Sequence, residues 1–378
     1  MKKNRKLLSM LFALMLISMS VFAFTACGNN DSDEQDDGRA AQVEDQEDDT
    51  DEPEAPPEDE ADEPEEVTEP EEEEPEEVIE PEEEAEPFSI GVIQLMEHPA
   101  LDAATEGFIA QLRDEGIDFT YEVQNGQRDV AILDTIANLF VGNEVDLVLA
   151  NGTMSAQAIA NATNTIPVVG VSITTFVGAG VVESNEAPGR NITGASDMNP
   201  IQAQIEMMLE FLPNIQTIGL LYSSNEANSV YQASLAREII EELGLSSESA
   251  TITSAADLQQ VATSLAGNVD AIYIPTDNAI AGAMGVMANI SAETDTPVFA
   301  GEENMTMGGG VATLSVNYYE LGRQAGRMAA MILRGEGEPA TMPIQFAEQY
   351  NYTVNGFMVD LLGIEVPARF LDYIFMPE

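Results

Sequence analysis

The chain has 378 residues, of which 68 are acidic and 13 basic, and its formal charge at pH 7 is −55. So negative a chain is not expected to bind nucleic acid, because phosphate binding requires clustered cations. With a single cysteine and a single histidine it also lacks the soft ligands of a typical zinc site, and we expect no metal and no cofactor.

Residues 1–26 have the order of a secretory signal peptide, with cations at positions 2, 3, 5 and 6 before an uncharged apolar stretch. The only cysteine, Cys27, follows directly, and residues 24–28 (FTACG) resemble the lipobox of bacterial lipoproteins. That resemblance implies cleavage before Cys27 and attachment of diacylglycerol to its sulfur. Two acyl chains, at ~0.8 kcal/mol for each buried CH₂, anchor a protein stably to a lipid bilayer. The alternative is an uncleaved transmembrane anchor, since about 20 apolar residues can span a bilayer.

Residues 27–87 consist largely of Glu, Asp and Pro, with 32 acidic residues and one basic residue, Arg39. Such a segment has too few apolar side chains to offset the entropy of ordering, so we expect it to be disordered. Proline and charge repulsion favour extension, and at ~3.1 Å per residue the segment could reach on the order of 190 Å. We interpret it as a tether between the membrane anchor and the domain that follows; the alternative is an acidic solubilising tail.

From residue 88 onward, short apolar runs alternate with segments of helical periodicity. In the first series we expect strands at 89–95, 119–123, 145–150 and 166–171, with helices at 99–116, 129–140 and 155–162. In the second series we expect helices at 200–211, 228–243, 257–265 and 279–290, with strands at 217–222, 249–253, 271–275 and 297–300. The tail predicts a strand at 312–316 after a glycine turn at 308–310, a helix at 321–333, a strand near 350–354 and a final helix.

This alternation predicts an α/β fold of two doubly wound parallel-sheet lobes joined by a hinge. We assign residues 88–196 and 318–378 to the first lobe and residues 197–317 to the second. The folded part contains 36 acidic residues, eight arginines and no lysine.

In open α/β sheets, ligands bind beyond the carboxyl ends of the strands, where helix N-termini point their free N–H groups. The residues at those ends are mostly hydroxyls, amides and carboxylates, and none is an arginine. The candidate ligand-binding residues are Gln94, His98, Thr153, Ser155, Thr175, Phe176, Tyr222, Asn225, Glu226, Thr276, Asp277 and Glu302.

The sequence has few of the residue patterns on which enzyme active sites depend. His98 could serve a serine–histidine triad, but no G-x-S-x-G turn accompanies it, and a capping or pocket-lining histidine is the plainer interpretation. Neither a phosphate-binding G-x-x-x-x-G-K-[ST] loop nor a G-x-G-x-x-G turn after a strand is present. Adjacent carboxylates such as Glu302 and Glu303 are expected in so acidic a chain. We therefore do not expect an enzyme.

Several longer strings resemble one family, the substrate-binding lipoproteins of ABC transporters that include tryptophan- and tyrosine-type binders. The strings lie at residues 90–108, 155–158, 177–180, 191–194, 226–229, 273–278 and 318–324. The resemblance implies a type I periplasmic-binding-like fold whose hinged cleft delivers a solute to a membrane permease. Thr175-Phe176 stands where family members often carry Asp-Pro, and Asn151-Gly152 where they carry two small residues, so a known ligand does not transfer directly.

These features predict a small zwitterion, most simply an amino acid with an aromatic or large apolar side chain, bound between the lobes. Its carboxylate would lie at Thr153 and Ser155 on a helix N-terminus, and its ammonium group at Asp277, with Glu226 or Glu302 as rivals. Phe176 and Tyr222 could stack on a ring.

Each of these assignments has a plainer alternative: Thr153, Ser155 and Asp277 as helix caps, and Phe176 and Tyr222 as core residues. For the protein as a whole, two alternatives stay open. One is a membrane-tethered sensor or scaffold that uses the same cleft, and the other is an importer component for a sugar or nucleoside.

Overall fold

The computed structural model describes residues 86–376. The predicted signal peptide, Cys27 and nearly all of the predicted tether therefore lie outside the described residues. Within 86–376, no helix has the length and the apolar character needed to cross a membrane.

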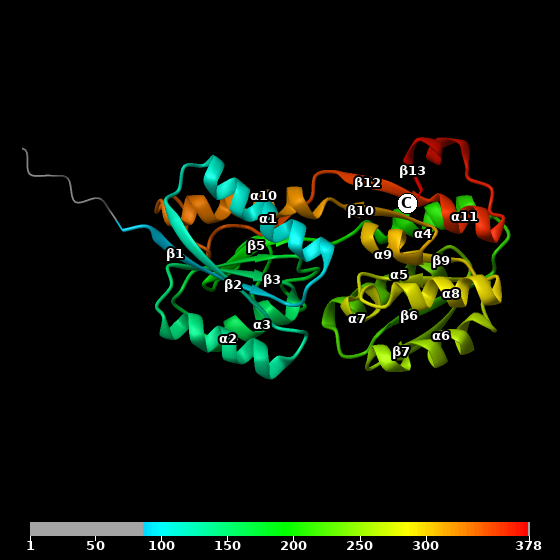
Figure 1. Ribbon diagram of the computed structural model, residues 1–378, viewed down its shortest axis with the longest axis horizontal. Helices are drawn as coiled ribbons and strands as arrows, with labels where there is room; N and C mark the ends of the chain where they lie inside the picture. Colours follow the sequence, from blue (N-terminus) through cyan, green and yellow to red (C-terminus); the bar gives the residue numbers. More distant parts are fainter. Residues whose placement is uncertain (1–85, 377–378) are drawn as a thin grey trace, which may run out of the picture. The chain divides into compact units, whose positions relative to one another are not determined.

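The first lobe is built on a six-stranded parallel sheet with the strand order β11-β5-β4-β3-β1-β2. Its strands are β1 Phe88–Gln94, β2 Phe119–Asn125, β3 Leu147–Asn151, β4 Val168–Val171, β5 Ile192–Ser196 and β11 Gln345–Phe346. Its helices are α1 Pro99–Asp114, α2 Val130–Gly142, α3 Thr153–Ala162 and α10 Tyr318–Leu333. Figure 1 shows this sheet between helices α1 and α10 on one side and α2 and α3 on the other.

Helices cover both faces of this sheet, as its continuous apolar strands require. Along β3, Leu147 and Leu149 face the core formed with α1 and α10, whereas Val148 and Ala150 face α2 and α3. The two helices α1 and α10 approach closely at glycines. A Cβ on Gly322 would lie 2.0 Å from the backbone oxygen of Ala104.

The second lobe combines a four-stranded parallel sheet, β7-β6-β8-β9, with a three-stranded sheet, β10-β12-β13. Its strands are β6 Thr217–Ser223, β7 Ser246–Ile252, β8 Ala271–Ile274, β9 Val298–Ala300, β10 Ala312–Val316, β12 Tyr350–Asn355 and β13 Ile374–Phe375. Its helices are α4 Ile201–Phe211, α5 Ala227–Glu242, α6 Leu258–Ala266, α7 Asn278–Ala281, α8 Met284–Thr294, α9 Glu303–Gly309 and α11 Gly356–Leu362, with short 3₁₀ turns at Ala255–Asp257 and Ala368–Tyr373.

The assignment of all of 318–378 to the first lobe is wrong for its last part. Helix α10 and strand β11 do join the first lobe, but β12 returns and pairs antiparallel with β10, with Val354 opposite Ala312. The C-terminal side chains then pack in the core of the second lobe, where the ring of Phe370 stacks on Phe211 with 5.0 Å between centroids. Residues 350–376 therefore belong to the second lobe.

Three smaller differences concern single elements. Residues 191–197, expected to be only a connection, contain β5, which adds a strand to the first sheet. The helix expected at 279–290 is broken into α7 and α8 around Gly282. The glycines at 308–310 are not an isolated turn, because Gly308 and Gly309 end α9.

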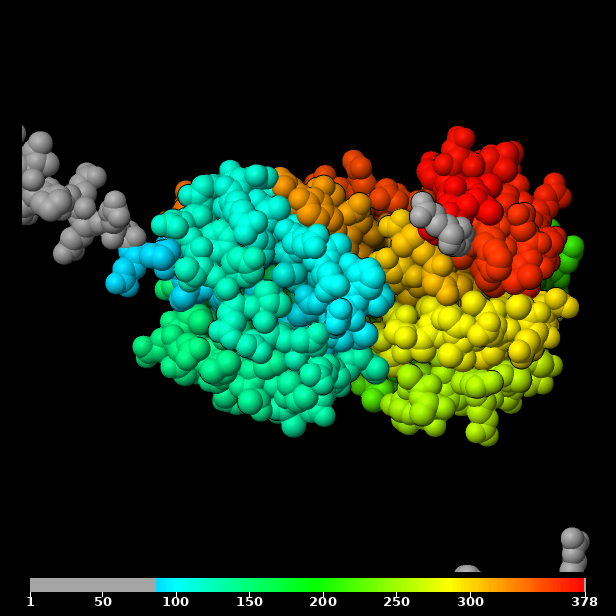
Figure 2. All heavy atoms as spheres, viewed as in Figure 1, coloured from blue at the N-terminus to red at the C-terminus, as the bar shows by residue number. Residues whose placement is uncertain are grey.

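The chain passes between the lobes three times, after β5, after β10 and between β11 and β12. These crossing segments lie side by side: the backbone N–H of Val316 donates to the Asn199 side chain at 3.0 Å, and Val316 is opposite Tyr350 in the β10–β12 ladder. On the face shown in Figure 2, the surfaces of the two lobes touch.

Candidate functional site

A small cavity lies between the lobes beside the crossing segments. Its volume is about 20 Å³, room for a water molecule or two. It is lined by His98, Ala100, Leu101, Ser172, Asp197, Asn228, Thr276, Asp277, Asn278, Ala281, Glu302, Met305 and Tyr318. Four of the twelve predicted site residues are among them: His98, Thr276, Asp277 and Glu302.

The first lobe contributes the N-terminus of α1. His98 is its N-cap, and the imidazole Nδ1 accepts a hydrogen bond from the backbone N–H of Ala100 at 3.3 Å. An accepting Nδ1 leaves the ring proton on Nε2. Burial lowers the pKa of His98, and the nearby Asp102 carboxylate only partly opposes this effect. His98 is thus a neutral cap and at the same time part of the cavity wall.

Gln94 supports this wall from behind instead of reaching the cavity. Its amide nitrogen donates to Asp102 at 2.6 Å, and its oxygen accepts from the hydroxyl of Thr105 at 2.8 Å. Both partners lie on α1, so Gln94 ties the end of β1 to the first turns of the helix.

Ser172 also comes from the first lobe, directly after β4, and sequence reasoning missed it. Its backbone has φ = 57°, in the left-handed region that serine rarely adopts. The residue is 7% exposed, it lines the cavity, and its Oγ has no hydrogen-bond partner. A strained residue with an unpaired buried hydroxyl is a feature that functional sites often contain.

The second lobe contributes two buried carboxylates that cap short helices. Asp277 accepts hydrogen bonds from the backbone N–H and hydroxyl of Ser223 at 2.6 and 2.8 Å, and from the N–H of Ile280 at 2.9 Å. Glu302 accepts from the N–H groups of Asn304 and Met305. Despite those bonds, burial raises the pKa of Glu302 to about 7.

A third carboxylate, Asp197, stands where the chain first crosses between the lobes, and sequence reasoning missed it because 197 looked like a boundary. It is 2% exposed and accepts from the hydroxyls of Thr174 and Tyr318, both at 3.0 Å. Burial raises its pKa as well. Asp197, Asp277 and Glu302 therefore face one cavity whose lining contains neither lysine nor arginine.

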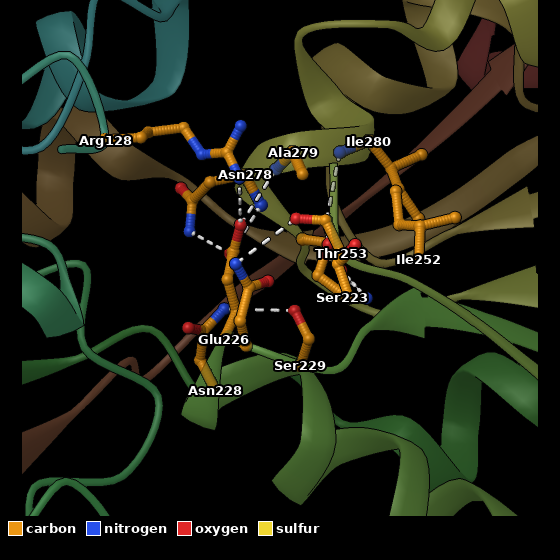
Figure 3. A network of polar contacts seen from close by, with 12 residues as sticks. Arg128, Ser223, Glu226, Asn228, Ser229, Ile252, Thr253, Asn278, Ala279 and Ile280 are labelled. Carbon is orange, nitrogen blue, oxygen red and sulfur yellow. Dashed lines mark hydrogen bonds and ion pairs between the residues drawn. The ribbon is translucent and has the colours of Figure 1, made fainter. Parts of the chain in front are cut away.

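Glu226 does not line the cavity; it joins the two lobes. Arg128, in the β2–α2 loop of the first lobe, places a guanidinium nitrogen 3.0 Å from the Glu226 carboxylate of the second lobe (Figure 3). The same carboxylate accepts from the backbone N–H groups of Asn278 and Ala279, at the start of α7. Burial and the neighbouring Asp277 raise the pKa of Glu226, although Arg128 opposes them.

The other predicted site residues lie outside the cavity lining. Phe176 is fully buried in the core of the first lobe, beside Gly170, so the prediction that it stacks on a ligand ring is wrong. Tyr222 packs at the margin of the core of the second lobe. Thr175 binds the N–H of Gly178, and the exposed Asn225 donates to a backbone oxygen in the 253 loop. Thr153 and Ser155 are buried in the first turn of α3.

Within residues 86–376, no three His, Cys, Asp or Glu side chains are grouped so that they could hold a metal ion.

Two lobes that enclose a polar cavity at their hinge define a bilobed solute-binding protein. The family model for ABC transporter substrate binding proteins matches residues 89–375, and the chain belongs to that family.

Three known proteins are similar to this chain over most of its length. The chain is 32% identical to a tyrosine-binding protein of Clostridioides difficile over 295 residues, which cover 77% of this chain and 85% of the relative. It is 32% identical to a Streptococcus domain solved in complex with L-Trp, with a TM-score of 0.74 over 77% of this chain and 99% of that one. It is 34% identical to a ligand-free, open substrate-binding protein of Clostridium difficile, with a TM-score of 0.63 over 77% and 99% of the two chains.

The comparison also bears on how the lobes are arranged. At nearly equal identity and coverage, the chain superimposes better on the L-Trp complex than on the open, ligand-free protein. In the present structure the lobes are in contact through Arg128 and Glu226 and leave only a small cavity between them, an arrangement that we call closed.

Proposed function

We propose that this chain binds an aromatic amino acid between its lobes and delivers it to the permease of an ABC importer. The single observation that carries the choice of ligand is the set of three buried carboxylates around a cavity without a cationic side chain. Buried carboxylates without a cation are costly, and an ammonium group in the cavity would neutralise one of them.

The aromatic side chain is proposed from the relatives, one named for tyrosine and one solved with L-Trp. The cavity offers apolar surface for such a ring in Leu101, Ala281 and Met305. Because a cavity of about 20 Å³ is far smaller than an aromatic amino acid, the lobes must move apart to admit the solute and must enclose it less tightly than in this structure. A ligand that contacts both lobes then favours the closed form by its differential affinity.

We further propose that the protein acts outside the cytoplasm as a lipoprotein, anchored through Cys27 and carried on the acidic segment at 27–87. Mass spectrometry of the mature N-terminus tests the anchor, and a chain that begins at Met1 would contradict it.

The ligand is tested by a thermal-shift screen of the full-length chain against amino acids, nucleosides and sugars. We expect L-tryptophan, L-tyrosine or both to raise the melting temperature by mass action. Indole-3-propionate, which keeps the ring and the carboxylate of tryptophan but lacks the ammonium group, should have little effect. If no aromatic amino acid stabilises the protein, or if indole-3-propionate does so equally well, the proposal fails.

A further inference from the structure

The cavity is polarised between the two lobes. Its carboxylates come from the second lobe and the first crossing segment, as Asp277, Glu302 and Asp197. Its wall from the first lobe contains no acidic side chain; it consists of His98, Ala100, Leu101, Ser172 and Tyr318. A zwitterion therefore fits in one orientation only, with its ammonium group toward the carboxylates and its own carboxylate toward the first lobe.

The wall from the first lobe is suited to an anion. Helix α1 has 16 residues. In its first turn Pro99 has no N–H group, the N–H of Ala100 donates to His98 Nδ1 and that of Asp102 to the His98 oxygen, which leaves the N–H of Leu101 for a ligand. The aligned peptide dipoles give that end about half a positive charge. Ala100 and Leu101 of the first turn line the cavity, and the cap of the helix, His98, is neutral.

The helix ends on the opposite wall differ from α1. The short helices α7 and α9 begin at Asp277 and Glu302, whose carboxylates already accept the N–H groups of the first turns. These ends are therefore neutralised by the protein itself, and a second anion there would meet like charge.

Ser172 gives independent evidence for a ligand on the side of the first lobe. Within residues 86–376, three serines have a buried Oγ without a hydrogen-bond partner, namely Ser155, Ser172 and Ser315, and of these only Ser172 lines the cavity. A buried hydroxyl without a partner is rare because leaving it unpaired costs free energy. A ligand atom in the cavity would remove this cost.

We propose, on the basis of the proposed function, that Ser172 and the N-terminus of α1 bind the carboxylate of the amino acid, while its ammonium group lies against Asp197, Asp277 and Glu302. This replaces the prediction that α3, with Thr153 and Ser155, binds the carboxylate. Ser172 is thereby the residue that distinguishes amino acids from the corresponding amines.

The test compares L-tryptophan with tryptamine, and L-tyrosine with tyramine, by calorimetric titration of the full-length protein. Each amine keeps the ring and the ammonium group and lacks only the carboxylate. Wild type should bind the amino acid more tightly than the amine. Ser172→Ala should weaken the amino acid about tenfold, as expected for a lost hydrogen bond to a charged group, and change the amine less than twofold.

Ser172→Gly guards against misfolding, because glycine adopts the positive φ of this position without strain, and the same loss is expected. Ser315→Ala is the matched control: Ser315 also has a buried Oγ without a partner, but it lies in β10 outside the cavity lining and should leave both affinities unchanged.

The inference is overturned if both Ser172 variants leave the ratio of amino acid to amine affinity unchanged, or if they weaken both ligands equally. It is also overturned if Ser155→Ala removes the preference for the amino acid over the amine, because that result would indicate that the carboxylate binds at α3. In those cases wild type still binds the amino acid and the proposed function stands. If wild type binds neither ligand, both proposals fail.

Discussion

Replacing Arg128 by alanine should weaken binding of the ligand, although Arg128 does not line the cavity. The guanidinium group of Arg128 in the first lobe pairs at 3.0 Å with Glu226 in the second. Its loop is held firmly, because the Arg128 N–H donates to the Leu95 oxygen at 2.9 Å and the Gly126 N–H to the Gln94 oxygen at 2.8 Å. Opening the lobes separates the ion pair, so the free energy of the pair stabilises the closed form relative to the open form.

The magnitude lies between two limits. Removing one partner of a fully buried ion pair costs about 3–5 kcal/mol, whereas an exposed pair contributes about 0.2–1 kcal/mol. The Glu226 side chain is 1% exposed but that of Arg128 is 24% exposed, and Glu226 keeps its backbone donors at α7. We therefore expect about 2 kcal/mol, which corresponds to roughly a 30-fold loss of apparent affinity.

Calorimetric titration of Arg128→Ala with L-tryptophan or L-tyrosine measures the affinity, and small-angle scattering of the unliganded protein measures the opening. Arg369→Ala is the control, since Arg369 pairs with Glu210 inside the second lobe and both side chains are exposed. The double variant Arg128→Ala/Glu226→Gln should lose less than the sum of the single variants, because the unpaired buried charge is gone. Affinity and radius of gyration unchanged in Arg128→Ala would refute the reasoning.

Three further predictions concern stability. The pKa of Glu302 rises from 4.5 to about 7 on folding, so between these pH values the folded protein retains a proton that the unfolded chain loses. The free energy of unfolding should therefore fall by about 3 kcal/mol as the pH rises from 4.5 to 7. Denaturant titration of unliganded Glu302→Gln should show a flatter pH dependence, and an unaltered slope would contradict this. Gly322→Ala should destabilise the protein by about 1–3 kcal/mol or more in thermal unfolding, because the new Cβ would clash with the Ala104 backbone. Gly335→Ala is the control: the space around Gly335 is open, so this variant tests only the strain of a positive φ. Deleting residues 350–378 should prevent folding of the second lobe, as judged by circular dichroism and solubility, because β10 loses its partner β12; a folded truncated protein would show that the tail is dispensable.

Much of the fold follows from local patterns. The apolar runs that become β1, β3, β4, β6 and β8 are short and nearly continuous, as buried parallel strands must be, and Asp129 and Asp277 cap helices where the pattern begins. The partner of a strand is not encoded in this way. Nothing in the alternation of 350–355 distinguishes pairing with β10 from a place in the first sheet, and only the core around Phe370 decides it.

The same distinction, between what local patterns predict and what tertiary packing decides, applies to the candidate site. His98, Thr276, Asp277 and Glu302, which the sequence places at strand ends, line the cavity, because topology alone brings those ends together. The direction of a side chain at a strand end depends on the backbone, however. Phe176 turns into the core, whereas Ser172 turns to the cavity through a positive φ that its sequence does not reveal.

Under the proposed function, the triple connection between the lobes would limit how a permease can sense the solute. Three backbone segments connect the lobes, and they lie side by side through the Val316 N–H bond to the Asn199 side chain and the pairing of Val316 with Tyr350. If hinge bending is the main motion that these joined segments allow, the separation of two points on opposite lobes reports how far the lobes have closed. A transporter that grips one point on each lobe could thus distinguish a loaded carrier from an empty one without touching the cargo.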